Sequence, residues 1–178
     1  SPIAACLLLG ILDERGVEVD LMTYSEGQDV PFRHVTHYRT PDLPFLRGMR
    51  PGFSLKKLVA DFFLLLIALP LLVRNRYDVI HAVEEMAFVA LALKPLSKTP
   101  YVYDMDSSLA QQLVEQMPSL GPLARVLGWF ERSAVRRAEV VVAVCDALGE
   151  VAAAHGAREI VLLYDVPLLD ERGGGPVE

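Results

Sequence analysis

Three short apolar runs, each followed directly by a helical segment, constrain the fold of this chain more than any other feature. Strands that are apolar on both faces are typical of parallel sheets covered by helices, and helices supply the crossover connections between such strands. The sequence therefore predicts an α/β domain of three layers, with a mainly parallel sheet between two layers of helices. The runs cover residues 77–82, 100–103 and 139–144, and the helical segments after them cover residues 85–94, 107–117 and 146–154.

The start of the chain indicates that one strand of this sheet is missing. Ser1 and Pro2 suit the N-cap and first turn of a helix, and Gly16 suits its C-terminal end. A doubly wound sheet normally begins with a central strand instead. We therefore expect a vacancy in the sheet, whose unpaired strand edges could pair with a second copy of the chain to give a dimer. Further strands are expected at 17–24, 33–38 and 159–163, and further helices at 53–76 and 122–137.

Composition and charge exclude several classes of protein. Hydrophobic residues make up 52% of the 178 residues and charged residues 22%, which excludes a disordered chain and supports a buried core. The net charge of −6 argues against a nucleic-acid-binding protein. The longest uncharged apolar run, residues 62–73, is too short to span a bilayer.

The expected compartment is the cytoplasm. No basic segment precedes the first apolar stretch, as a signal peptide would require. Cys6 and Cys145 match no metal-ligand or redox spacing, and this indicates reduced thiols in a reducing compartment. The length fits one domain, which we place at residues 1–167, followed by a glycine-rich linker at 168–178.

Four stretches of the chain resemble one family of enzymes. LGILDERGVEVDLMT (9–23) resembles a leucine-rich helix and strand of the family 4 glycosyltransferases. YDVIHA (77–82), PYVYDMD (100–106) and RAEVVVAVC (137–145) resemble three later strands of the same family. The resemblance runs in the same order from about residue 2 to residue 166. It departs from the family at Asp106, where the family has a histidine, and at Cys145, where it has a serine.

The resemblance implies a Rossmann-like three-layer domain, the N-terminal, acceptor-side half of an enzyme with the GT-B architecture. The complete enzyme would move a sugar from a nucleotide sugar to an acceptor, with retention of configuration and with no metal or other cofactor. A second domain, which this sequence lacks, would hold the nucleotide sugar. We therefore expect residues 168–178 to lead towards that domain, and this chain alone to be inactive. The alternative is a binding or interaction domain that has lost catalysis.

The segment Asp104-Met105-Asp106 is the sharpest local feature, because it follows an apolar strand at the place where α/β sheets bind ligands. Acceptor contact by these aspartates and capping of the next helix by Asp106 or Ser107 are equally favoured. A phosphatase of the haloacid dehalogenase type, with Asp104 as nucleophile, is less favoured, because that motif normally lies near the N-terminus. A metal-binding Asp-x-Asp motif like that of GT-A glycosyltransferases is favoured least.

The resemblance places further candidate residues around an acceptor pocket. His81, Glu84, Asp104 and Ser107 would bind the acceptor, and Asp106 is the candidate catalytic residue. A histidine at the carboxyl end of a strand can relay a proton, although a lone histidine is more often a hydrogen-bonded core residue.

Basic residues gather in residues 33–57, which carry six of them, including Arg47 and Arg50, and a single acid, Asp42. One interpretation is an anionic acceptor bound by these arginines. A related one is contact with anionic lipid at the inner face of a membrane, with the apolar helix 53–76 lying on the surface. A solvated loop beside a buried helix is slightly favoured, because that helix is apolar on all sides.

Overall fold

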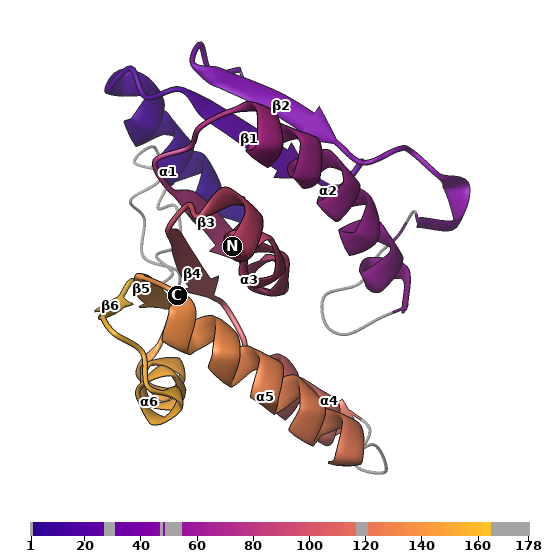
Figure 1. Cartoon of the computed structure of the whole chain (residues 1–178), viewed down its shortest axis with the longest axis vertical. Coiled ribbons are helices and arrows are strands. Elements are labelled where there is room, and N and C mark those ends of the chain that lie inside the picture. Colours follow the sequence, from indigo (N-terminus) through magenta and orange to yellow (C-terminus); the bar gives the residue numbers. More distant parts are fainter. Residues whose placement is uncertain (1, 27–30, 47, 49–54, 117–120, 165–178) are drawn as a thin grey trace, which may run out of the picture.

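The computed structural model describes residues 2–26, 31–46, 48, 55–116 and 121–164, and its elements alternate between helix and strand (Figure 1). The helices are α1 (Pro2–Glu14), α2 (Leu55–Arg74), α3 (Met86–Ser97), α4 (Leu109–Gln116), α5 (Gly121–Arg137) and α6 (Asp146–His155), with a short 3-10 helix, η1, at Pro44–Leu46. The strands are β1 (Val19–Thr23), β2 (Val35–Arg39), β3 (Ile80–Val83), β4 (Tyr101–Met105), β5 (Val140–Ala143) and β6 (Ile160–Leu162).

All strand pairs in the described part of the chain are parallel, and they form two separate sheets. β1 pairs with β2, and the second sheet has the order β3-β4-β5-β6. The prediction of an α/β domain with parallel sheets is therefore confirmed. The predicted interruption is also present, because β1 and β3 each pair with one neighbour only within the described residues. The expected linker at 168–178 lies outside those residues.

A row of helices covers one face of the sheets and connects them. α2 packs on α3, α3 on α5, and α5 on α6. The same helices contact the strands beneath them: α2 lies on β1, α3 on β3 and β4, and α6 on β5 and β6 (Figure 1). This arrangement is a Rossmann-like fold, in which helical crossovers join parallel strands.

β4 shows how the sequence places the core. Tyr101, Tyr103 and Met105 are buried, whereas Val102 and Asp104 are half-buried on the opposite face. Alternate residues of a strand point to opposite faces, so the first three contact the core that α3, α5 and α6 share. The Tyr101 hydroxyl donates to the Ala134 carbonyl in α5, and this bond satisfies its polar end inside the core.

The expectation of a buried helix over residues 53–76 is wrong. α2 buries one face, through Ala60, Leu64 and Ala68, but its opposite face exposes large apolar side chains such as Phe62 and Val73. Burial depends on whether a second layer covers the helix, which the composition of the helix does not reveal. In the described part of the chain, no helix is both long and apolar enough to cross a membrane.

Candidate functional site

The candidate site is built around His81 and Asp104, which lie on the neighbouring strands β3 and β4. His81 Nε2 lies 3.0 Å from Asp104 Oδ2, and the two side chains are 35% and 19% exposed. β3 continues to Val83, so His81 lies inside its strand and not at its end, contrary to the sequence prediction. Both side chains point away from the core face that carries Ala82 and Tyr103. They can therefore reach a ligand from the open face of the sheet.

Glu84 and Glu85 form the turn after β3, beside this pair. The Glu84 N–H donates to the Asp104 carbonyl at 2.9 Å, which adds one hydrogen bond to the pairing of β3 with β4. Glu84 has a φ of 51°, in the left-handed region that is unfavourable for residues other than glycine. Such backbone strain persists only where surrounding contacts hold it in place, and it is common at ligand sites.

Lys57 of α2 supplies those contacts. Its Nζ lies 2.7 Å from Glu84 Oε2 and 2.8 Å from Glu85 Oε2, and its side chain is only 13% exposed. Burial alone would lower the pKa of the Lys57 ammonium, but its hydrogen bonds to the two glutamates outweigh burial and raise it. Burial raises the pKa of the Glu85 carboxyl, and Lys57 opposes that shift. One ammonium thus shares its charge between two carboxylates at the site.

Tyr24 and Asp61 extend this network towards the smaller sheet. Tyr24 follows β1, and its hydroxyl donates to Asp61 Oδ1 in α2. Burial and the neighbouring Asp61 carboxyl both raise the pKa of the Tyr24 hydroxyl. Burial also raises the pKa of the Asp61 carboxyl, against the opposing effects of Tyr24 and Lys57. Polar side chains from both sheets therefore meet at α2.

The turn between β4 and α4, which carries Asp106 and Ser107, is fixed by Ser108. Both preceding residues are half-buried. The cap of α4 is Ser108, whose Oγ accepts the Gln111 N–H at 3.3 Å, so the interpretation of Asp106 or Ser107 as the cap is wrong.

Glu131 of α5, which the sequence analysis did not select, fixes this turn through hydrogen bonds to Ser108 and Leu109. Its side chain is fully buried, and its carboxylate accepts the Ser108 hydroxyl at 3.0 Å and the Leu109 N–H at 3.0 Å. His155 Nε2 lies 3.2 Å from the same carboxylate. The sequence did contain one signal for the burial of Glu131. Glu131 lies three positions before Ala134 and four before Val135, so it shares one face of α5 with these two buried residues.

The structure thus brings together His81, Asp104 and Glu84, with Asp106 and Ser107 in the next turn. It does not gather their carboxylates: among the described residues no three histidine, cysteine, aspartate or glutamate side chains share a position suited to a metal ion. Arg47 and Arg50, the predicted anion-binding residues, lie outside the described residues.

The fold and this site define a class of protein: a Rossmann-like domain with polar side chains near the carboxyl ends of adjacent parallel strands, where such folds bind ligands. Residues 4–164 match the family model of the glycosyl transferase 4-like domain, and the chain belongs to that family. The resemblance that the sequence motifs indicated is therefore confirmed. A comparison with curated proteins found no significant match. The family match supports a glycosyltransferase function and favours it over the phosphatase interpretation.

Proposed function

We propose that this chain is the acceptor-side domain of a GT-B glycosyltransferase, which moves a sugar from a nucleotide sugar to an acceptor with retention. The observation that carries the proposal is the accessible pair formed by His81 and Asp104, beside a turn held in a left-handed conformation at Glu84. The family match over residues 4–164 supports the class of reaction.

In this proposal the pair binds and orients an acceptor hydroxyl. The Asp104 carboxylate accepts a hydrogen bond from the hydroxyl, while His81 can donate or accept according to its tautomer. Glu84 and Ser107 are proposed to contact the acceptor beside this pair, and Asp106 in the next turn is the candidate catalytic residue. Positioning of this kind contributes to the rate because it fixes the attacking oxygen close to the sugar.

A second domain would hold the nucleotide sugar and close over the acceptor, so that water is excluded from the transfer. This chain alone is then expected to show no sugar transfer above a blank. The transfer is proposed to need no bound metal, and to occur in the cytoplasm at the inner face of a membrane. The spacing of the two cysteines, which matches no metal-ligand or redox motif, supports a reducing compartment.

The test uses the protein that carries both domains. His81→Ala and Asp104→Asn are each expected to lower kcat/KM for the acceptor by roughly 10- to 100-fold, because a hydrogen bond to a charged partner contributes about 1.5–3 kcal/mol. His34→Ala is the matched control, since His34 pairs with Glu18 outside the site. If both site variants transfer sugar at the rate of the unchanged protein, the assignment of the pocket is wrong.

The competing function is a binding domain without catalysis. Its motivation is Asp106, which stands where the family has a histidine. If the two-domain protein binds an acceptor but transfers no sugar from any nucleotide sugar, and Asp106→His creates transfer, this second function is correct.

A further inference from the structure

The turn between β4 and α4 is short, and the residues at both of its ends are buried. Met105, the last residue of β4, is buried and pairs with Ala143 of β5. Leu109, the first residue of α4, is also buried. Residues 106–108 join these two positions, and each residue has only two soft backbone dihedrals. A backbone fixed at both ends therefore leaves Asp106 and Ser107 few conformations.

Glu131 of α5 fixes the second end of this turn. The Ser108 hydroxyl lies 3.0 Å from Glu131 Oε1 and 3.1 Å from Oε2, and the Leu109 N–H donates to Oε2 at 3.0 Å. Ser108 Oγ also accepts the Gln111 N–H, so its own hydrogen is directed at the carboxylate. One side chain of α5 therefore determines where α4 begins.

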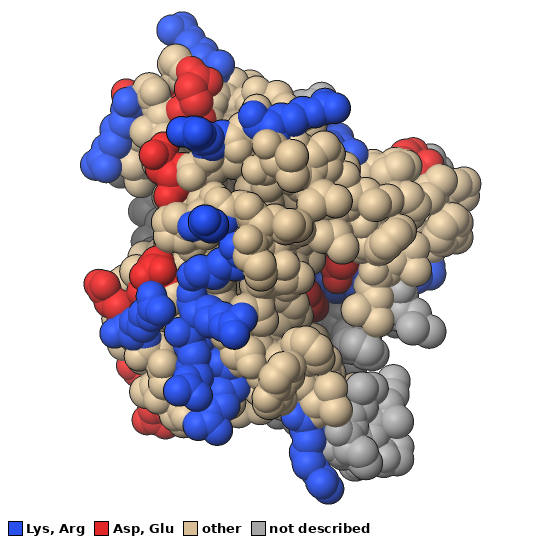
Figure 2. Space-filling model, in the orientation of Figure 1, with Lys and Arg blue, Asp and Glu red and all other residues tan. Residues whose placement is uncertain are grey.

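The Glu131 carboxylate is held in place from a third helix. His155, at the C-terminal end of α6, places Nε2 3.2 Å from Glu131 Oε1. Glu131 is the acid of α5 and is fully buried, whereas Arg132 and Arg136 of the same helix are exposed. Figure 2 shows Lys and Arg side chains gathered over the C-terminal part of α5. The cations of this helix thus lie at the surface, and its acid lies inside, beside the turn.

A buried carboxylate is suited to fixing a geometry. Its net contribution to stability is small compared with that of an apolar side chain, because the loss of hydration offsets much of what its hydrogen bonds contribute. Its bonds are directional, and each must be kept once the group is buried. An apolar residue in place of Glu131 would occupy the same space but would leave Ser108 and Leu109 unanchored. The carboxylate therefore serves the place of the turn more than the packing of the core.

We propose that Glu131 is a positioning residue for sugar transfer: through Ser108 and Leu109 it sets the place of Asp106 at the acceptor site. The inference rests on the proposed function, in which Asp106 is the candidate catalytic residue. Glu131 does not itself touch the acceptor, because its side chain is fully buried.

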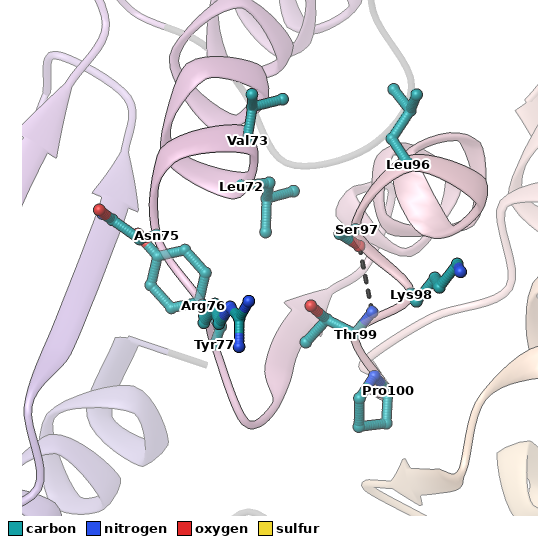
Figure 3. A pocket seen from close by; sticks show the side chains of 10 residues that line it. All are labelled: Leu72, Val73, Asn75, Arg76, Tyr77, Leu96, Ser97, Lys98, Thr99 and Pro100. Carbon is teal, nitrogen blue, oxygen red and sulfur yellow. Dashed lines mark hydrogen bonds between the residues drawn. The ribbon is translucent and has the colours of Figure 1, made fainter.

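A pocket of about 440 Å³ lies at the other end of the same strands and offers a control position. Its lining includes Tyr77 and Pro100, which precede β3 and β4, and the C-terminal ends of α2 and α3 (Figure 3). Lys98 also lines this pocket. Lys98 and Asp106 thus lie at opposite ends of β4, so a change at Lys98 leaves the turn at Asp106 untouched.

The experiment measures kcat and KM of the protein that carries both domains, at a temperature at which circular dichroism shows each variant to be folded. Glu131→Ala should lower kcat by roughly 10- to 100-fold, because a misplacement of about 1 Å can cost about 100-fold. KM for the nucleotide sugar should change by less than about twofold, since the second domain would hold that substrate. Glu131→Gln should keep kcat within about fivefold of the unchanged protein, because its amide oxygen still accepts one bond and a single hydrogen bond contributes about fivefold.

Two control variants leave the turn intact. Tyr101→Phe removes a different buried hydrogen bond to α5, the one from the Tyr101 hydroxyl to the Ala134 carbonyl. Lys98→Gln changes the pocket at the far end of β4. Both should keep kcat within about twofold of the unchanged protein, because sites that share no partners act independently within about that factor.

A double-mutant cycle separates positioning from a general loss of stability. If Glu131 acts through Asp106, Glu131→Ala should lower kcat by less than about twofold in a protein that already carries Asp106→Asn. Should Glu131→Ala not fold, Ser108→Ala takes its place in the cycle, because it removes the hydroxyl that the carboxylate accepts. This variant alone should lower kcat by about fivefold.

The inference is overturned if the effects of the two substitutions multiply, or if the variant in the cycle leaves kcat unchanged. It is also overturned if Tyr101→Phe lowers kcat as much as that variant does, since the loss then follows stability alone. If the unchanged two-domain protein transfers no sugar, the proposed function is wrong and the inference is wrong with it. In each of the other cases only the role of Glu131 is wrong.

Discussion

Lys57 Nζ lies within 2.8 Å of a carboxylate oxygen of Glu85 and 2.7 Å from one of Glu84, so one side chain of α2 holds the turn that follows β3. α2 packs on β1, whereas the turn belongs to the four-stranded sheet. Because β1 and β3 do not pair with each other, polar side-chain bonds and the packing of α2 on α3 link the two sheets. A second such link is the hydrogen bond from the Tyr77 hydroxyl to Asp20 of β1.

Replacement of Lys57 by methionine should destabilise the fold by about 2 kcal/mol, because it leaves the largely buried Glu85 carboxylate and the half-buried Glu84 carboxylate without their cation. Urea unfolding gives this free energy. Arg158→Met is the control, since Arg158 pairs with Glu139 at the surface, where an ion pair contributes little. Equal effects of the two substitutions would contradict the role of Lys57 as a link.

Replacement of Glu131 by alanine should cost about 3 kcal/mol, because the Ser108 hydroxyl and the Leu109 N–H both lose a buried acceptor. Glu131→Gln should cost less, since its amide oxygen can still accept from one of the two. A second measurement is hydrogen exchange at the Leu109 amide, which should accelerate in both variants. Glu150→Gln, at an exposed position of α6, should change neither quantity.

Asp61 makes stability depend on pH. Burial raises the pKa of its carboxyl above the ordinary 3.8, so the folded protein holds this proton more tightly than the unfolded chain. Its contribution to stability is therefore fully present below pH 3.8 and is lost as pH rises through the raised pKa. Asp61→Asn does not titrate and keeps an oxygen for the Tyr24 hydroxyl.

The stability of Asp61→Asn relative to the unchanged protein should thus increase as pH rises from 3.8 through the raised pKa of the Asp61 carboxyl. Urea unfolding at several pH values measures the difference. A difference that stays constant over this range would show that the Asp61 carboxyl is not perturbed by burial.

Titration calorimetry with Mg²⁺ and Mn²⁺ should detect no binding tighter than millimolar. Asp104 is engaged by His81, and a hard cation prefers about six oxygen ligands, which the described side chains around Asp104 do not assemble. Micromolar binding that disappears in Asp104→Asn or in Asp106→Asn would refute a metal-free site.

The candidate site could be predicted in part. Asp104 was selected because it follows an apolar run, and His81 because it was expected at the carboxyl end of another. The parallel register of β3 and β4 does bring their side chains into contact. Glu131 was missed, since its partners Ser108 and Leu109 lie more than 20 residues away and no local pattern connects them. Lys57 was counted only among the six basic residues of 33–57, although its ammonium pairs with the acids of a turn 27 residues away.

The sequence by itself determined the order of helices and strands and the parallel sense of the sheets, because these follow from local periodicity and from the length of the connections. It also determined the family, through motifs that extend along nearly the whole chain. Only the tertiary structure decided which face of α2 stays exposed and which carboxylates share Lys57. An apolar composition shows that a helix can be buried. Whether it is buried depends on whether another layer packs against it, and that is a property of the whole fold.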